Sequence, residues 1–382
     1  MLAAAGIVTL AIWIYLLLGR GGFWRIQQTV APAPANEIPA RVAAIIPARN
    51  EADVVGRTVT SLLRQSGPHS IQIFLVDDSS ADGTAEAARK AAESAGKVAS
   101  LTVIQGSLLA PGWSGKLWAV QQGIEQASKT SPDFFLLTDA DIEHASDSLS
   151  TLISIAHAGR YDLVSFMVKL YCASLAEKLL IPAFVYFFFK LYPPALIANP
   201  HSAMAGAAGG CILILPATLS QAGGIESIRH EVIDDCALAK RVKQSGARTW
   251  LGCSATTQST RPYGSFAEIG RMISRSAFNQ LHHSNLLLLL SISGMVITYL
   301  LPPALVLFGH HTWPIMLGAL AWLLMIITYI PVLRLYRLNP LWALALPLVA
   351  TFYMGATFHS AWKYWTGRGG EWKGRVQDPV KS

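Results

Sequence analysis

Apolar and polar stretches alternate regularly between residues 41 and 168. Short apolar runs of strand length are separated by longer stretches of helical composition. The apolar runs are Val42–Ile46, Ile71–Val76, Leu101–Ile104, Phe134–Leu137 and Leu163–Val168, and the helical stretches are Ala52–Leu63, Thr84–Ala95, Lys116–Ala127 and Ser148–Ala158. This alternation predicts βαβ units that form a mostly parallel, doubly wound α/β sheet.

Two further elements are expected after this region. The small-residue loop Gly206–Gly210 leads into an apolar strand, Cys211–Leu215. The stretch His230–Gln244 begins with acids and ends with bases, which suits the dipole of a helix. We therefore expect one α/β domain over residues 41–284, preceded by a Pro/Ala-rich linker within residues 20–40.

Long hydrophobic runs flank this domain. Leu2–Leu18 is about long enough to cross a bilayer, and Arg20 and Arg25 follow it. The positive-inside rule then predicts an uncleaved anchor, residues 1–19, with the following domain in the cytoplasm. Three more runs predict about three C-terminal membrane helices within residues 285–362, namely Leu286–Phe308, Trp313–Leu333 and Leu341–Ala361.

Two features complicate this topology. The run Leu179–Phe189 is too short to cross a bilayer comfortably, so an interfacial helix or an apolar wall is expected near residues 176–197. A third C-terminal crossing would also place the basic tail, residues 363–382, outside the cell, against the positive-inside rule. Either one run is re-entrant, such as that holding Pro302-Pro303, or the rule fails; we expect a cytoplasmic tail.

Composition agrees with a partly membrane-embedded chain. Of 382 residues, 52% are hydrophobic and 14% charged, whereas soluble domains carry roughly a quarter charged residues. The net charge is +7, and Lys and Arg gather beside hydrophobic runs, which favours an anionic lipid surface over nucleic acid. The four cysteines, Cys172, Cys211, Cys236 and Cys253, have no metal-ligand spacing, so we expect free thiols in a reducing compartment.

The candidate chemistry lies at strand ends. Asp139 and Asp141 follow the run Phe134–Leu137, where ligands of open α/β sheets bind. Residues two apart in an extended segment face the same way, so both carboxylates can face one hard cation. The alternative is a strand followed by an ordinary polar turn.

A second strand end carries Asp77-Asp78. These carboxylates can accept hydrogen bonds from a ribose diol or a base, and adjacent acids repel unless something compensates them. Ser80 and Asp82 suit turn and helix-capping roles instead. No G-x-G-x-x-G opens a helix, and Gly115-Lys116 lacks the P-loop pattern, so dinucleotide and P-loop NTPase functions are disfavoured.

Five segments in order resemble family 2 glycosyltransferases, which have a GT-A fold. They are Pro47-Ala-Arg-Asn-Glu51, Asp77–Thr84, Ser114-Gly-Lys116, Thr138-Asp-Ala-Asp141 and Ile233-Asp-Asp235. The resemblance covers roughly Arg41 to Leu281. Within the family the chain looks most like bacterial hopanoid-associated glycosyltransferases, through Gly209–Leu213, His230–Leu238, the Arg271–Arg275 helix and Trp372–Arg375.

The resemblance implies a nucleotide-sugar donor and a divalent cation, Mg²⁺ or Mn²⁺, held by Asp139 and Asp141, because oxygen-only ligands do not suit zinc. It assigns donor binding to Pro47, Arg49, Glu51, Asp77, Asp78, Lys116, Asp139, Gly209, Gly210 and Arg275. The alternatives are a solvated loop charge for Arg49, an ordinary helix residue for Lys116 and a tight strand entry for Gly209 and Gly210.

The resemblance also implies a general base that accepts the acceptor's proton, with inversion at the sugar. Asp235 is the candidate, but Asp234 stands where the family has Glu, so either acid could take the proton. A helix N-terminal acid pair stabilised by the dipole is the structural alternative. Arg275 meets either the diphosphate or anionic lipid, since the family's Q/R-x-x-R-W motif is incomplete here. His282-His283 is expected at the headgroup boundary and not at a metal.

Together these features predict a multi-pass protein of the bacterial inner membrane with a cytoplasmic catalytic domain. It would move a sugar from a nucleotide-sugar donor, expected to be a UDP-sugar, to a lipid acceptor related to hopanoids, without nucleic-acid partners. A processive polysaccharide synthase is one alternative, but it needs a pore of several helices and usually has the complete motif, and the few spans here argue against it. A transporter or scaffold is another, but its spans should contain ionisable residues, and these runs have essentially none.

Overall fold

The structure is a computed structural model that describes residues 2–26, 38–372 and 375–378. The chain forms two compact units. We call Gln27–Tyr171 with Leu196–Arg261 the α/β unit, and Met1–Ile26, Cys172–Ala195 and Pro262–Ser382 the helical unit. Most of the predicted linker and part of the basic tail lie outside the described residues.

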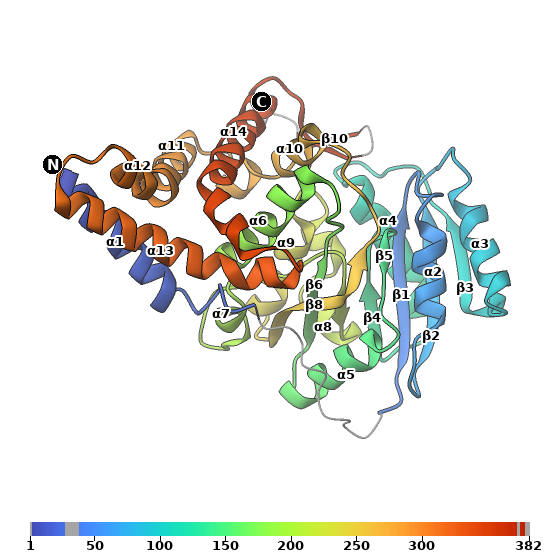
Figure 1. Ribbon diagram of the computed structural model, residues 1–382. Coiled ribbons are helices and arrows are strands. Elements are labelled where there is room, and N and C mark those ends of the chain that lie inside the picture. The colour runs from blue at the N-terminus through green and yellow to red at the C-terminus, as the bar shows by residue number, and fades with distance from the viewer. Residues whose placement is uncertain (1, 27–37, 373–374, 379–382) are drawn as a thin grey trace. The chain divides into compact units, whose positions relative to one another are not determined.

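The α/β unit is built on an eight-stranded sheet with the order β3-β2-β1-β4-β7-β6-β8-β5 (Figure 1). Its strands are β1 (Arg41–Ala48), β2 (Ser70–Asp77), β3 (Leu101–Gln105), β4 (Phe134–Leu137), β5 (Ile142–Glu143), β6 (Leu163–Lys169), β7 (Ile212–Ile214) and β8 (Thr249–Ser259). The five strands predicted between residues 41 and 168 are all present. The long strand β8 was not predicted.

The sheet is mixed and not simply a parallel, doubly wound one. β1 runs parallel to β2 and β4, β2 to β3, and β6 to β8. However, β7 runs antiparallel to both β4 and β6, and β5 is antiparallel to β8. Parallel neighbours need a crossover that packs on the sheet. Between β6 and β7 the chain instead leaves the α/β unit after Tyr171 and returns at Leu196, so β7 is free of that constraint.

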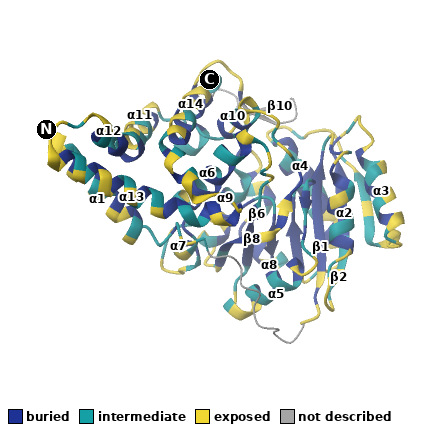
Figure 2. Cartoon of the chain, viewed as in Figure 1, coloured by how far each residue is buried: buried dark blue, intermediate teal, exposed yellow. Residues whose placement is uncertain are grey.

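Helices cover both faces of this sheet. Successive residues of β1 point to opposite faces, Val42, Ala44 and Ile46 into one apolar core and Ala43 and Ile45 into the other. The first core is completed by α2 (Val55–Leu63), α3 (Thr84–Ser94) and α5 (Ser148–Gly159), and the second by α4 (Gly115–Ser128), α8 (Pro216–Gln221) and α9 (Asp234–Gln244). The central strands are accordingly buried along most of their length (Figure 2).

The packing of α4 depends on one glycine. A Cβ at Gly123 would lie 2.6 Å from Cγ2 of Ile45 and 3.1 Å from Cγ2 of Val76. Gly123 therefore lets α4 approach β1 and β2 closely. This approach fixes the N-terminal end of α4, which begins at Gly115, against the sheet.

The helical unit contains α1 (Leu2–Leu18), α6 (Leu175–Leu191), α10 (Phe266–Ser274), α11 (Asn285–Met295), α12 (Leu301–Phe308), α13 (Thr312–Leu335) and α14 (Leu346–Trp365), and α7 (Pro194–Ala198) follows α6 at the boundary. A hairpin of β9 (Gly369–Trp372) and β10 (Arg375–Asp378) ends the described chain. Short 3-10 turns occur at Val98–Ser100, Ile225–Ile228, Asn279–Leu281 and Pro340–Ala345.

Four helices of the described chain are long and apolar enough to cross a membrane. They are Leu175–Ala198, Asn285–Phe308, Thr312–Leu335 and Pro340–Trp365, while α1 is shorter at 17 residues. A π-helical turn, Val296–Leu300, carries the helix into Pro302-Pro303, so the helix runs through these prolines.

The helix Leu175–Ala198 is longer than the sequence suggested. The expected apolar run stopped at Lys190 because a lysine normally ends a buried segment. In the structure Lys190 Nζ lies 2.9 Å from the hydroxyl of Tyr299 within the helical unit, and α6 continues to Leu191. By length and composition this helix can span a membrane. The sequence instead favoured an interfacial helix here.

Candidate active site

Lys116 connects three segments of the predicted site: the start of α4, the segment after β4 and the start of α9. It lies in the first turn of α4, and its Nζ is 3.0 Å from Oδ1 of Asp139 and 3.1 Å from Oδ2 of Asp234. Asp139 follows β4, and Asp234 opens α9. Two acids far apart in the sequence are thus connected through one ammonium group, which is more than an ordinary first-turn lysine does.

Charge and burial oppose each other in this cluster. Burial alone would lower the pKa of Lys116, but the neighbouring Asp139, Asp234 and Asp235 raise it, so the ammonium group stays protonated. Burial also raises the pKa of Asp139, although Lys116 acts in the opposite direction. Three carboxylates face one lysine, so the cluster has a surplus of negative charge.

Asp235 lies beside this cluster and is held by the backbone. Its Oδ2 accepts a hydrogen bond of 2.8 Å from the Gly209 N–H, and its Oδ1 accepts one of 2.7 Å from the Cys236 N–H. Burial, together with the charge of Asp234, raises the pKa of Asp235 to about 6, while Lys116 and the backbone donors oppose the rise. A carboxylate with a pKa near neutrality can accept a proton efficiently under physiological conditions.

A second cluster holds Asp141. The C-terminal end of β8 pairs with β5, Ser259 opposite Ile142, and this pairing places Arg261 beside the acid. The Nε of Arg261 donates to Oδ2 of Asp141 at 3.1 Å, and its Nη2 pairs with Oε2 of Glu51. Glu51 and Asp141 are largely buried, with 9% and 14% of their side chains exposed. Arg261 is therefore the counterion of two predicted site acids.

Asp139 and Asp141 are held in the same way, each through one of its two carboxylate oxygens. One oxygen of each is held, Oδ1 of Asp139 by Lys116 and Oδ2 of Asp141 by Arg261 and Ser259. No hydrogen bond within the described part of the chain engages the second oxygen of either acid. Both oxygens are hard donors of the kind that Mg²⁺ and Mn²⁺ prefer.

The charge balance of the site also fits a cation. Five carboxylates, Glu51, Asp139, Asp141, Asp234 and Asp235, surround two bases, Lys116 and Arg261. Across the described ranges, no three His, Cys, Asp or Glu side chains converge on one point as a metal cage. The protein would therefore supply few ligands, and phosphate and water oxygens would complete the shell, as is common for Mg²⁺.

A third group of predicted residues lies at the end of β2. Arg49 Nη1 donates to the backbone oxygen of Asp78 at 2.7 Å and lies 3.4 Å from its carboxylate. The Nε of Arg49 is buried and has no hydrogen-bond partner among the described residues. A buried donor without a partner is costly, which is consistent with a ligand acceptor at this point.

Neighbouring residues of this loop have structural roles. Asp82 accepts hydrogen bonds from the Ala52 and Thr84 N–H groups, and the Ser80 hydroxyl accepts one from the Asn50 N–H. Asp82 thus fixes the turn before α3, as expected, whereas Ser80 links this loop to the loop that holds Asn50. Asp77 is buried, and its Oδ1 accepts a hydrogen bond from the Ser80 N–H at 2.9 Å.

The two loop glycines differ. A Cβ at Gly209 would lie 3.4 Å from both Oδ2 of Asp235 and Nζ of Lys116, so Gly209 faces the acids. A Cβ at Gly210 would instead lie 3.1 Å from Val168 and 3.3 Å from Ile142, which fits the tight strand entry. A cavity of about 30 Å³ lies here, lined among others by Pro47, Lys116, Asp139, Gly209, Asp234 and Asp235.

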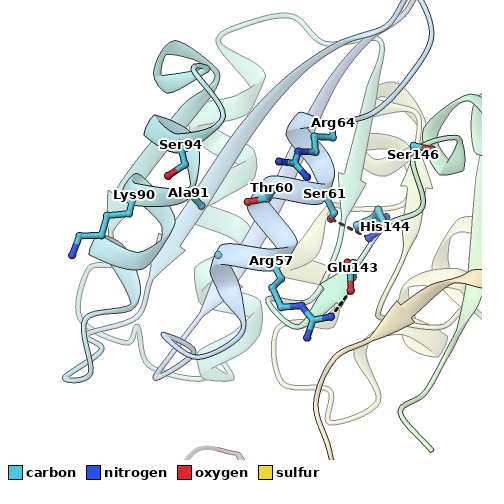
Figure 3. Close-up of a pocket in the computed structure, with 11 residues that line it drawn as sticks. Arg57, Thr60, Ser61, Arg64, Lys90, Ala91, Ser94, Glu143, His144 and Ser146 are labelled. Carbon is cyan, nitrogen blue, oxygen red and sulfur yellow. Dashed lines mark hydrogen bonds and ion pairs between the residues drawn. The ribbon is translucent and has the colours of Figure 1, made fainter.

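A larger groove, of about 490 Å³, lies between α2, α3 and the end of β5 (Figure 3). Arg57, Arg64 and Lys90 line it, and Arg57 pairs with Glu143 at 2.6 Å. None of the predicted site residues lines it. The clustered acids, and not the larger groove, therefore mark the candidate site.

Arg275 stands apart from these residues in the chain. It belongs to the helical unit and caps the C-terminal end of α10, so its predicted contact with the diphosphate stays a prediction. In the same unit the His283 ring stacks on Tyr364, with ring centroids 4.0 Å apart. None of the four cysteines, which all lie among the described residues, forms a disulfide.

Sequence reasoning missed Arg261 and His144. Arg261 follows a strand without clear alternation, so no pattern drew attention to it. His144 is 4% exposed, and its Nε2 lies 3.0 Å from the hydroxyl of Thr138, which in turn donates to the Gly210 carbonyl at 2.8 Å. His144 thus supports the segment that leads into Asp139. The signal available in the sequence was that His144 stands two residues after Asp141-Ile142, but a lone histidine is weak evidence for a functional role.

Structural comparison identifies the fold. The chain is similar to the mannosyltransferase PcManGT from Pyrobaculum calidifontis, solved in complex with GDP-Man and Mn²⁺, with a TM-score of 0.55 and 20% identity over 95% of this chain and 99% of that one. Glucosyl-3-phosphoglycerate synthase from Mycobacterium tuberculosis gives a TM-score of 0.40 and 16% identity, over 64% of this chain and 80% of that one. The α/β unit has a GT-A-like fold, as predicted.

Sequence comparison adds a match to one family model. Residues 43–216 match Glycosyl transferase family 2. No curated protein sequence matches the chain. The family match covers less than half of the chain, and with it the predicted enzyme class, a glycosyltransferase, is confirmed. Asp234, Asp235 and Arg261 lie beyond the matched residues.

Proposed function

We propose that this chain is a membrane-bound, cation-dependent, inverting glycosyltransferase. It transfers a sugar from a nucleotide-sugar donor, in our proposal a UDP-sugar, to the hydroxyl group of a membrane lipid. The observation that carries the proposal is the bridge from Asp139 through Lys116 to Asp234, which brings a strand-end acid next to the acids of α9. A glycosyl transfer needs both a place for the diphosphate and a base for the acceptor.

The base is Asp235. Its carboxylate accepts the proton of the acceptor hydroxyl as the hydroxyl oxygen attacks the anomeric carbon and the bond to the diphosphate breaks. Asp234 is paired with Lys116, so its charge is already engaged, and this favours Asp235 of the two candidates. The raised pKa of Asp235, about 6, matches proton transfer near neutral pH.

The donor would bind along the carboxyl ends of β1, β2 and β4. Arg49, with its unpartnered Nε, and Asp78 would hold the nucleoside side of the donor, and Lys116 would contribute positive charge near the diphosphate. Asp139 and Asp141 would hold a divalent cation, which when bound supplies Lewis-acid charge to the leaving group. The Mn²⁺ and GDP-Man in the similar mannosyltransferase support this assignment.

The lipid acceptor is inferred from the helical unit. Four helices of the described chain can cross a membrane, and their surfaces carry large exposed apolar side chains such as Leu289, Trp313 and Leu348. Such surfaces are stable in a bilayer. We further propose a hopanoid-related acceptor and a bacterial inner-membrane location with a cytoplasmic catalytic domain, on the sequence resemblance alone.

The test uses the full chain in membranes. Membranes with the wild-type chain are given a panel of nucleotide sugars and extracted lipids, and the lipids are examined by mass spectrometry for a single added sugar. Asp235→Asn should reduce transfer by at least about 10³-fold, and Asp234→Asn by less, with both variants still membrane-inserted and folded. Asp141→Ala should also abolish transfer. Unchanged transfer by Asp235→Asn and Asp141→Ala would contradict the mechanism, and a polymeric product would favour a processive synthase.

A further inference from the structure

Arg261 has an unusual position among the site residues. It follows β8 and places its guanidinium between two acids from different motifs, Asp141 after β4 and Glu51 after β1. The Thr260 N–H and hydroxyl also bond to the Asp141 backbone oxygen, at 2.8 and 3.0 Å, so this end of β8 is fixed to the acid. The contact is therefore a built part of the unit and not a passing surface ion pair.

The contact is made to only one side of Asp141. Arg261 Nε and the Ser259 hydroxyl both donate to Oδ2, at 3.1 and 3.0 Å. A cation bound to Oδ1 would then lie about 5–6 Å from the guanidinium, given metal–oxygen distances of about 2.1 Å. At this range in a partly buried site, a positive charge strongly opposes a divalent cation.

We propose that Arg261 holds down the affinity of the free site for a divalent cation, so that the cation binds together with a nucleoside diphosphate. The anionic diphosphate offsets the charge of Arg261 and supplies further oxygen ligands, and both effects favour the cation. This inference rests on the cation site of the proposed function. Arg261 acts through its charge beside Asp141 and is not itself a cation ligand.

The opposite role for Arg261 is also physically reasonable. A residue that only orients a metal-binding carboxylate typically strengthens metal binding by about 10–100-fold. Removal of an orienting residue would weaken Mn²⁺ binding, whereas removal of an opposing charge would strengthen it. The sign of the change therefore distinguishes the two roles, and at this short distance we expect the charge to dominate.

The experiment measures Mn²⁺ binding to the full chain in detergent by electron paramagnetic resonance, with and without UDP. Arg261→Gln should bind Mn²⁺ alone at least tenfold more tightly than wild type. UDP should then increase the Mn²⁺ affinity of Arg261→Gln less than that of wild type, because the opposing charge is already gone. Arg261→Lys keeps the charge, so its affinity for Mn²⁺ should stay within about threefold of wild type.

The control is Arg57→Gln. Arg57 is exposed and pairs with Glu143 (Figure 3). No hydrogen bond or ion pair among the described residues joins Arg57 to Asp141 or Glu51, so this variant should bind Mn²⁺ like wild type. If Arg261→Gln does not fold, the comparison of Glu51→Gln/Arg261→Gln with Glu51→Gln carries the same measurement, because these two variants differ only in the charge of Arg261. An unchanged or weaker affinity for Mn²⁺ without Arg261 overturns the role proposed for Arg261 alone. A wild-type chain that binds no Mn²⁺ even with UDP overturns the cation site as well.

Discussion

The backbone N–H of Gly209 donates a 2.8 Å hydrogen bond to Oδ2 of Asp235. The same glycine has no side chain to fill the space between Asp235 and Lys116, since a Cβ there would lie 3.4 Å from each. The loop before β7 thus both holds the proposed base and leaves room beside it. The two residues are 26 positions apart in the sequence, and the fold brings them together.

The pH dependence of the reaction should reflect the protonation of Asp235. Its pKa is raised to about 6, and a base acts only when deprotonated. We expect kcat/KM to be constant above about pH 7 and to fall about tenfold per unit as the pH drops below 6. A steady-state profile from pH 4.5 to 8 measures this. A profile that stays flat down to pH 4.5 would rule out a base with this pKa.

Replacement of Lys116 should move that profile. Lys116 lowers the pKa of Asp235, so in Lys116→Gln this pKa rises above 6 and the acid limb shifts to higher pH. Activity at pH 6 should fall at least about tenfold relative to the variant's own plateau. Lys129→Gln, at the exposed C-terminal end of α4, is the matched control and should keep the wild-type profile. An unshifted limb in Lys116→Gln would show that the two groups are not coupled.

His144 should make the α/β unit sensitive to acid. Burial lowers its pKa to about 4, below the value of about 6.5 in an unfolded chain. Between pH 6.5 and 4 the unfolded chain therefore binds a proton that the folded chain does not, so stability falls as pH falls. The loss is about 3 kcal/mol over this range.

The variant His144→Gln should remove this part of the acid sensitivity. Gln has no ring to protonate and can still bond to Thr138. Thermal unfolding at pH 7 and pH 4 gives the comparison, and the exposed His157→Gln should behave like wild type. Equal acid sensitivity of His144→Gln and wild type would contradict the assignment.

Gly123 should be sensitive to the smallest substitution. In Gly123→Ala the new methyl group would meet Ile45 and Val76, so α4 must move away from the sheet, at a cost of about 1–3 kcal/mol. Gly56→Ala is the matched control in α2, because its Cβ would lie at ordinary distances, 3.7 Å and more from its neighbours. It should stabilise the chain by about 0.5–1 kcal/mol through helix propensity. Denaturant unfolding of both variants measures the difference, and similar stabilities would refute the packing argument.

Much of the α/β unit could be predicted because its signals are local. The strand Phe134–Leu137 was predicted with its observed bounds, since an apolar run between polar turns needs no tertiary information. The strand β8 could not be predicted, because its buried and exposed positions alternate irregularly and its pairing with β5 and β6 is set by distant segments. The direction of β7 depended on the departure of the chain from the sheet, which no local pattern encodes.

The candidate site, too, could be predicted where its signals are local and could not where they depend on distant segments. The acids at the ends of β2 and β4 could be found because parallel strands end at one edge of a sheet. Arg261 could not, since its importance arises only from its contacts with Glu51 and Asp141, which come from two other segments. Lys116 was found by resemblance, but only the structure shows that it pairs with both Asp139 and Asp234.

The interruption of the α/β unit between Tyr171 and Leu196 limits how the protein can be shortened. Helix α6 is inserted there, and its Tyr186 hydroxyl lies 2.8 Å from the Thr328 hydroxyl while its Leu180 carbonyl accepts a hydrogen bond from Tyr353. Removal of the C-terminal helices would leave α6 behind as an apolar segment without these partners, prone to aggregation. A water-soluble catalytic fragment would therefore require excision of the insertion as well as both ends of the chain.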